Sequence, residues 1–242
     1  MISILRSPVR KALPLLIVLS CAHVVGAAPK THIITFGKWT TVQWSVDSGG
    51  PDDKPGALKV RPLLVDARVR EFTIGTVHDV TDRLFVVRRA FRVNDSLPQE
   101  FVSPPHWQWQ RGGWLLVDRV TGHVSALNLP EFDALYSAAS WYRDYAAYCG
   151  VSEDGKKVFA IVAQINRRKP VLKKLLDGAT PGGGQKDAAV LDSSCPVPGW
   201  ERAPARVTFE PAGSTKQTFA IRGHAVDLIN ESEEPEDEEA SK

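Results

Sequence analysis

Short apolar stretches alternate with turn-forming residues along most of this 242-residue chain. The stretches are rich in Val, Ile, Thr, Phe and Trp, they are separated by Gly, Pro, Asp and Asn, and no long amphipathic repeat occurs among them. β-branched and aromatic side chains fit the pleated surface of a strand, whereas the separating residues favour turns. The pattern therefore predicts a mainly β chain of antiparallel sheets, arranged as a sandwich or as an incomplete propeller-like meander.

The expected strands share an apolar or β-branched centre that is bounded by turn residues. They cover residues 32–36, 41–46, 58–65, 68–74, 84–93, 114–117, 123–127, 145–151, 157–165, 205–209 and 218–229, the last divided by Gly223. One or two short helices are also expected. Residues 130–142 favour a helix over 131–140, because Pro130 suits a first helical turn and apolar residues follow at helical spacing. Residues 169–178 fit either a strand or a helix.

Two turns mark the clearest hairpins, at residues 118–122 and 152–155, where a glycine can supply the positive φ that closes each turn. The first, in the stretch VDRVTGHV, resembles the D-x-x-T-G turn of quinoprotein-type β-propeller blades. The second, in SEDGKKVFAIV, is similar to the S-P-D-G-K turn of TolB-type blades, with Glu153 in place of the proline. The resemblance covers these two hairpins and implies blade-like antiparallel sheets, although residues 28–110 show no matching repeat.

The first 27 residues have the order of an export signal. Basic residues precede an almost wholly apolar run over 12–25, and small residues end at Ala27. This run is shorter than the roughly 20 residues that span a membrane, and no later stretch is long and apolar enough. We therefore expect cleavage after Ala27 and export to the periplasm or the extracellular space. The alternative is a lipoprotein of the outer envelope, because VLSC resembles a bacterial lipobox in which Cys21 would be lipidated.

Two cysteines, Cys149 and Cys195, remain once the export signal is removed. An even number of cysteines in an oxidising compartment predicts a disulfide between them. The alternative is a pair of free, buried thiols.

Charge divides unevenly along the chain, which carries 30 basic and 28 acidic residues in all. Seven of the acidic residues and one lysine lie in residues 231–242. Such a tail cannot bury apolar surface and is predicted to be disordered. The sequence thus divides into a signal peptide (1–27), a single β-rich domain (28–230) and an acidic tail (231–242). The domain itself keeps 26 basic and 21 acidic residues.

An aromatic cluster is the first candidate binding surface. Trp107 and Trp109 would share one face of a strand, with Gln108 and Gln110 on the opposite face, and Trp114 follows shortly after. Exposed indoles beside amide side chains would suit a sugar ring. Buried indoles would instead anchor the core, because aromatic residues bury large areas.

A polar cluster is the second candidate. His78, Asp79 and Asp82 lie close together in the sequence, and with Glu71 they could form a basic or cation-binding site. The alternative is a turn in which these side chains cap backbone donors. Two groups of basic residues also offer a surface for anionic envelope polymers or lipid headgroups; they are Arg88, Arg89 and Arg92, and then Arg167, Arg168, Lys169, Lys173 and Lys174.

The chain contains no nucleophile elbow, zinc-protease motif, phosphate-binding loop or dinucleotide fingerprint. We therefore expect a non-enzymatic binding or assembly module of the bacterial envelope or secreted space. Its partner would be a polysaccharide, an anionic envelope component or a protein, and we expect no cofactor, metal or nucleic acid. One alternative is a carbohydrate-active or other hydrolase whose catalytic residues lie far apart in the sequence, and another is a partner-dependent subunit.

Overall fold

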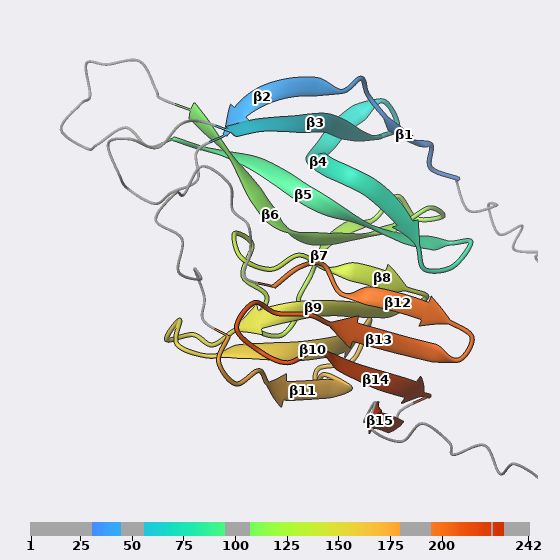
Figure 1. Ribbon diagram of the computed structural model, residues 1–242. Coiled ribbons are helices and arrows are strands. Elements are labelled where there is room, and N and C mark those ends of the chain that lie inside the picture. The colour runs from blue at the N-terminus through green and yellow to red at the C-terminus, as the bar shows by residue number, and fades with distance from the viewer. Residues whose placement is uncertain (1–30, 45–55, 95–106, 180–194, 224, 230–242) are drawn as a thin grey trace, which may run out of the picture. The chain divides into compact units, whose positions relative to one another are not determined.

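Strands carry the regular structure in the computed structural model, which is shown in Figure 1. The structure describes residues 31–44, 56–94, 107–179, 195–223 and 225–229. The strands in these ranges are β1 (Ile34–Phe36), β2 (Thr40–Trp44), β3 (Gly56–Val65), β4 (Arg68–Asp79), β5 (Leu84–Asn94), β6 (Trp107–Asp118), β7 (Val124–Leu127), β8 (Ser140–Tyr142), β9 (Tyr145–Val151), β10 (Val158–Gln164), β11 (Leu172–Leu175), β12 (Gly199–Arg202), β13 (Ala205–Phe209), β14 (Gln217–Arg222) and β15 (Ala225–Ile229). The prediction of a mainly β chain with antiparallel sheets is confirmed.

The first sheet contains β1 to β7 and is mostly a meander. Antiparallel pairings join β2 to β3, β3 to β4, β4 to β5 and β5 to β6. A parallel pairing between β2 and β6, with Trp44 opposite Trp109, then closes these five strands into a hydrogen-bonded ring. Asp66 and Ala67 have φ angles of 51° and 62°, and they form the tight turn that aligns β3 with β4.

Two four-stranded antiparallel sheets follow, β8 to β11 and β12 to β15, and in each the strands pair in chain order. Both predicted hairpins are present, as β6–β7 and β9–β10. Their turn glycines, Gly122 and Gly155, have φ angles of 65° and 67°, as the turn chemistry requires. The segment for which helix and strand were both open, 169–178, contains β11, which pairs with β10.

The apolar faces of the second and third sheets share one core. Its fully buried members include Val162 on β10, Val207 and Phe209 on β13, and Phe219 on β14. A second cluster joins the first sheet to the second through the contact of Val86 and Trp114 with Tyr148 and Ile161. Burial of these side chains on both sheets is therefore what fixes the position of β6, which carries the aromatic cluster.

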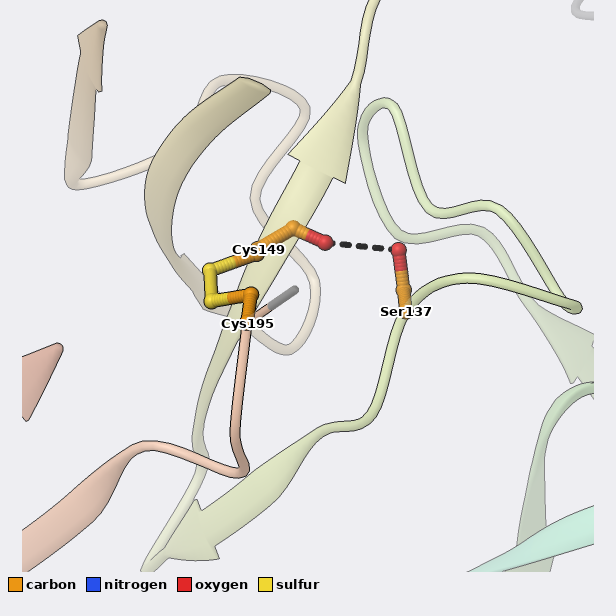
Figure 2. The surroundings of a disulfide bond; sticks show 3 residues. All are labelled: Ser137, Cys149 and Cys195. Carbon is orange, nitrogen blue, oxygen red and sulfur yellow. Dashed lines mark hydrogen bonds between the residues drawn. A yellow bond between two sulfur atoms is a disulfide. The ribbon is translucent and has the colours of Figure 1, made fainter. Parts of the chain in front are cut away.

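Cys149 on β9 and Cys195 before β12 form the predicted disulfide, with Cα atoms 6.2 Å apart. Each cysteine is 2% exposed and lies in the core that the second and third sheets share. Figure 2 shows that the Ser137 hydroxyl donates a hydrogen bond of 2.7 Å to the carbonyl of Cys149. The disulfide therefore links the second sheet covalently to the segment that enters the third sheet.

The short helix expected over residues 131–140 is not found, because these residues form turns that lead into β8. Glu131 has a φ of 53°, which a right-handed helix excludes. The Asp133 carboxylate also accepts hydrogen bonds from the backbone N–H groups of Leu135 and Tyr136. This side chain takes the place of helical backbone acceptors, which is the usual way in which aspartate favours a turn.

Candidate functional site

Trp107 and Trp109 project from the same face of β6, as strand alternation predicts. The guanidinium carbon of Arg92, on the neighbouring strand β5, lies 5.7 Å from the ring centroid of Trp107 and 5.5 Å from that of Trp109. Arg92 can contact both indoles because it lies directly opposite Trp109 in the β5–β6 register. An exposed positive charge is thus held close to two aromatic rings.

The two indoles differ in exposure. Trp107 is 56% exposed, whereas Trp109 is half-buried and lies in edge contact with Phe72 at 5.1 Å between ring centroids. Trp109 packs against the small core around Trp44. Trp109 therefore anchors the strand, and Trp107 is the ring that a ligand can reach. The half-buried Gln108 and Gln110 occupy the alternate positions of β6.

A β-bulge brings Trp114 onto the same face. Arg88 and Ala90 are two residues apart on β5, but their partners Trp114 and Arg111 are three residues apart on β6. The extra residue is one of the two glycines between these partners. Because of it, the side chains that follow point to the opposite face from the one that simple alternation would give. Trp114, Arg111 and the two indoles before them consequently share one face. Trp114 is only 9% exposed and packs against the second sheet.

We call this row of five residues the Trp–Arg stripe; its members are Trp107, Arg92, Trp109, Arg111 and Trp114. From Trp107 to Trp114 the stripe extends about 20 Å, at the usual rise of a strand. Its exposed part is the end formed by Trp107 and Arg92. Arg111 lies over the buried ring of Trp44, with 4.1 Å between the guanidinium carbon and the ring centroid.

The predicted polar site is not assembled as one cluster. His78 Nε2 lies 2.7 Å from the carbonyl of Arg143, in the turn before β9. Asp79 accepts a hydrogen bond of 2.5 Å from Arg119, which also donates to the backbone carbonyl of Asp82. These bonds join the predicted residues to other groups rather than to one another.

Glu71, the fourth member, lies elsewhere, in a cleft of about 700 Å³ that Asp118 also lines. Arg89 donates to Glu71 at 2.9 Å, and Arg83 donates to Asp118 at 2.9 Å. The hydrogen bond from Arg83 holds the pKa of Asp118 well below its usual range. A general acid needs the opposite shift, because it must keep its proton near neutral pH. Asp118 is therefore unsuited to the role of a general acid.

The basic residues of β5 separate onto two faces. Arg88 and Arg92 lie on the face of the sheet that carries the Trp–Arg stripe, whereas Arg89 faces the other side and binds Glu71. In the second basic group, Lys173 forms an ion pair with Glu131 and Lys174 lies over the ring of Phe219. The stripe is thus where basic and aromatic side chains alternate.

The sequence pattern did not single out Arg111, which belongs to the stripe, or Trp44, whose buried ring lies beneath Arg111. The signal for Arg111 was its place two residues after Trp109, which puts it on the same strand face. Trp44 could not be found in this way, because only the parallel β2–β6 pairing brings it beside Trp109.

The described ranges contain no group of His, Cys, Asp or Glu side chains that could hold a metal ion. They also contain no helix of the length and apolar character that a membrane span requires. The expected signal peptide with Cys21 and the expected acidic tail, residues 231–242, lie outside the described residues.

Comparison with known proteins identifies no relative: no protein-family model, curated protein or solved structure matches this chain. The resemblance of the two hairpin turns to propeller blades therefore stays a prediction. The function has to be argued from the surface itself.

Proposed function

We propose that this protein is an exported, non-enzymatic binding module that holds an acidic polysaccharide on its Trp–Arg stripe. The observation that carries the proposal is the position of Arg92, whose guanidinium lies within about 6 Å of both the exposed ring of Trp107 and the half-buried ring of Trp109. A cation and two π-surfaces are thereby presented together on one strand face.

The chemistry of an acidic sugar complements this arrangement. The apolar face of a sugar ring can stack on an indole, which buries a large area with little loss of side-chain freedom. A carboxylate on the same or the next sugar can accept charge-assisted hydrogen bonds from a guanidinium. Trp107 and Arg92 are both exposed, so a polymer can contact an aromatic ring and a charge at this end of the stripe.

Two features support a binding role over a catalytic one. The carboxylate that shares a cleft with Glu71, Asp118, is ion-paired and has a lowered pKa. The stripe itself is built of arginine and tryptophan. Arginine binds anionic groups and tryptophan stacks on ligand rings, but neither supplies a carboxylate for acid–base catalysis.

Export is supported by independent features of the sequence and the fold. The first 27 residues have the composition of a signal peptide. The Cys149–Cys195 disulfide is of the kind that persists in an oxidising compartment. An envelope or extracellular location would place the protein beside acidic polysaccharides.

Affinity electrophoresis tests the proposal directly. The protein is run through native gels that contain polygalacturonate, and through matched gels that contain dextran, a neutral polymer. We expect retardation in the polygalacturonate gel alone, reduced by added salt because charge pairing contributes to the affinity. Equal mobility in both gels would contradict the proposal.

A further inference from the structure

A cleft lies at the buried end of the Trp–Arg stripe, where Arg111 and Trp114 line it. It has a volume of about 420 Å³, and its polar lining comes from Arg88, Arg111, Trp114, Lys59 and Thr76. Apolar residues of the first sheet and of the turn before β8 complete the wall, among them Ile74 and Ala139. The volume suits a small organic molecule or one unit of a larger one.

Arg88 is held in this cleft by backbone carbonyls. Its Nε donates to the carbonyl of Gly112 at 3.2 Å, and its Nη2 donates to the carbonyl of Ala134 at 2.5 Å. Phe132 lies alongside, with its ring centroid 5.7 Å from the guanidinium carbon. These contacts fix the plane of the guanidinium and use two of its five N–H groups.

Neither arginine of the cleft forms an ion pair within the described part of the chain, although the negative charge of Asp133 acts on Arg88 and opposes the lowering of its pKa. Among these residues no carboxylate lies within 4.0 Å of the guanidinium of Arg88 or of Arg111. Burial, assisted by the charge of Arg111, lowers the pKa of Arg88 to about 10, so Arg88 still carries its proton at neutral pH. Burial also lowers the pKa of Arg111.

Trp114 adds an unused donor. Its indole nitrogen is buried and has no hydrogen-bond acceptor among the described residues. Buried donors and charges normally have partners, because their removal from water is otherwise costly. Arg88 and Arg111 line the same cleft, and an anion would offset the cost of removing the two charges from water.

We infer that this cleft binds the carboxylate of an organic acid, with Arg88 and Arg111 holding the carboxylate and the apolar wall contacting the body of the ligand. A planar carboxylate matches the paired donors of a guanidinium. The apolar wall favours an acid with a carbon body over inorganic phosphate. The inference goes beyond the proposed function, because it requires neither Trp107 nor a polymer.

Thermal-shift and calorimetric titrations of the full-length protein with benzoate test the inference, with benzamide and inorganic phosphate at equal ionic strength for comparison. We expect benzoate to raise the Tm, because a ligand that binds the native state stabilises it. We expect benzamide and phosphate to have little effect. An equal shift with phosphate, or no shift with benzoate, would overturn the inference.

Variants locate the site. Arg111→Gln should weaken benzoate binding about tenfold or more, since it removes a charged donor. Arg111→Lys keeps the charge but loses the paired donors, so it should also bind more weakly and serves if the glutamine variant folds poorly. Arg92→Gln is the matched control, because this arginine lies on the stripe outside the cleft, and it should bind benzoate as the wild type does. Unchanged affinity in both Arg111 variants, or a tenfold loss in Arg92→Gln, would refute the assignment. If the wild-type protein binds benzoate but does not bind polygalacturonate, the proposed function alone is rejected.

Discussion

Removal of the Cys149–Cys195 disulfide is expected to lower stability strongly, although neither cysteine lies at the proposed binding surface. The bond closes a loop with a sequence separation of 46. In the chain-entropy account, a loop of this length restricts the unfolded state by about 4 kcal/mol at 25 °C. For a domain of this size, 1 kcal/mol corresponds to roughly 2–4 °C, so the Tm should fall by about 8–16 °C.

Guanidinium titration followed by tryptophan fluorescence measures this loss. The double variant Cys149→Ala/Cys195→Ala is compared with the oxidised protein, both in a Cys21→Ala background so that no third thiol can exchange. Both cysteines are 2% exposed, so the alanine substitutions also remove buried sulfur. A second sample, unfolded and refolded in reductant, keeps both sulfur atoms but lacks the crosslink. Comparing its stability with that of the double variant separates the loss of packing from the loss of the crosslink.

The reduced protein should lose most of the stability that the double variant loses. A free energy of unfolding within about 1 kcal/mol of the oxidised protein would contradict the account, because it would mean that the crosslink restricts the unfolded state far less than its loop length implies. Two freely reactive thiols in native protein purified without reductant would contradict the disulfide itself.

Two further predictions concern the fold. Asp118→Asn should lower the Tm at pH 7, because the hydrogen bond from Arg83 holds the pKa of Asp118 below its unfolded value near 4. A carboxylate whose pKa is lowered in this way stabilises the fold above its unfolded pKa. This stabilisation is lost as the pH falls. The difference from the wild type should therefore narrow between about pH 4 and pH 2, and a constant difference in melting scans would contradict this explanation. Phe209→Ala should cost about 3–5 kcal/mol in guanidinium titrations, because Phe209 is 0% exposed in the shared core. The exposed control Val69→Ala should change stability by less than about 0.5 kcal/mol, and similar losses in both variants would be inconsistent with the core assignment.

The long strands were predictable because their signals are local. β3, β5 and β9 are rich in β-branched, apolar and aromatic residues and end at turn residues, and both glycine turns could be located from sequence alone. β8 and β12 were missed, since they are three and four residues long and carry no clear alternation. The turns over residues 131–139 carried helical spacing, but the side-chain hydrogen bonds of Asp133 determined the local structure.

The binding surface was predictable only in part. Alternation along β6 placed Trp107 and Trp109 together, but it did not reveal that Arg92 contacts both of them. That contact depends on the register between β5 and β6, which packing over the whole hairpin sets. The bulge beside Trp114 likewise depends on how β5 and β6 pair. Two adjacent glycines in a sequence do not indicate on which face of the strand the next side chain will lie.

The role of Trp107 in binding an acidic polysaccharide is tested most directly by comparing two tryptophan variants in polygalacturonate gels. Trp39 is the matched control, because it is 48% exposed and lies near an arginine, Arg61 at 4.4 Å, but is not part of the stripe. Trp107→Ala should weaken the apparent affinity about tenfold, the usual effect of removing an aromatic anchor, whereas Trp39→Ala should match the wild type. Equal retardation of the wild type and of both variants would show that the Trp–Arg stripe does not bind the polymer.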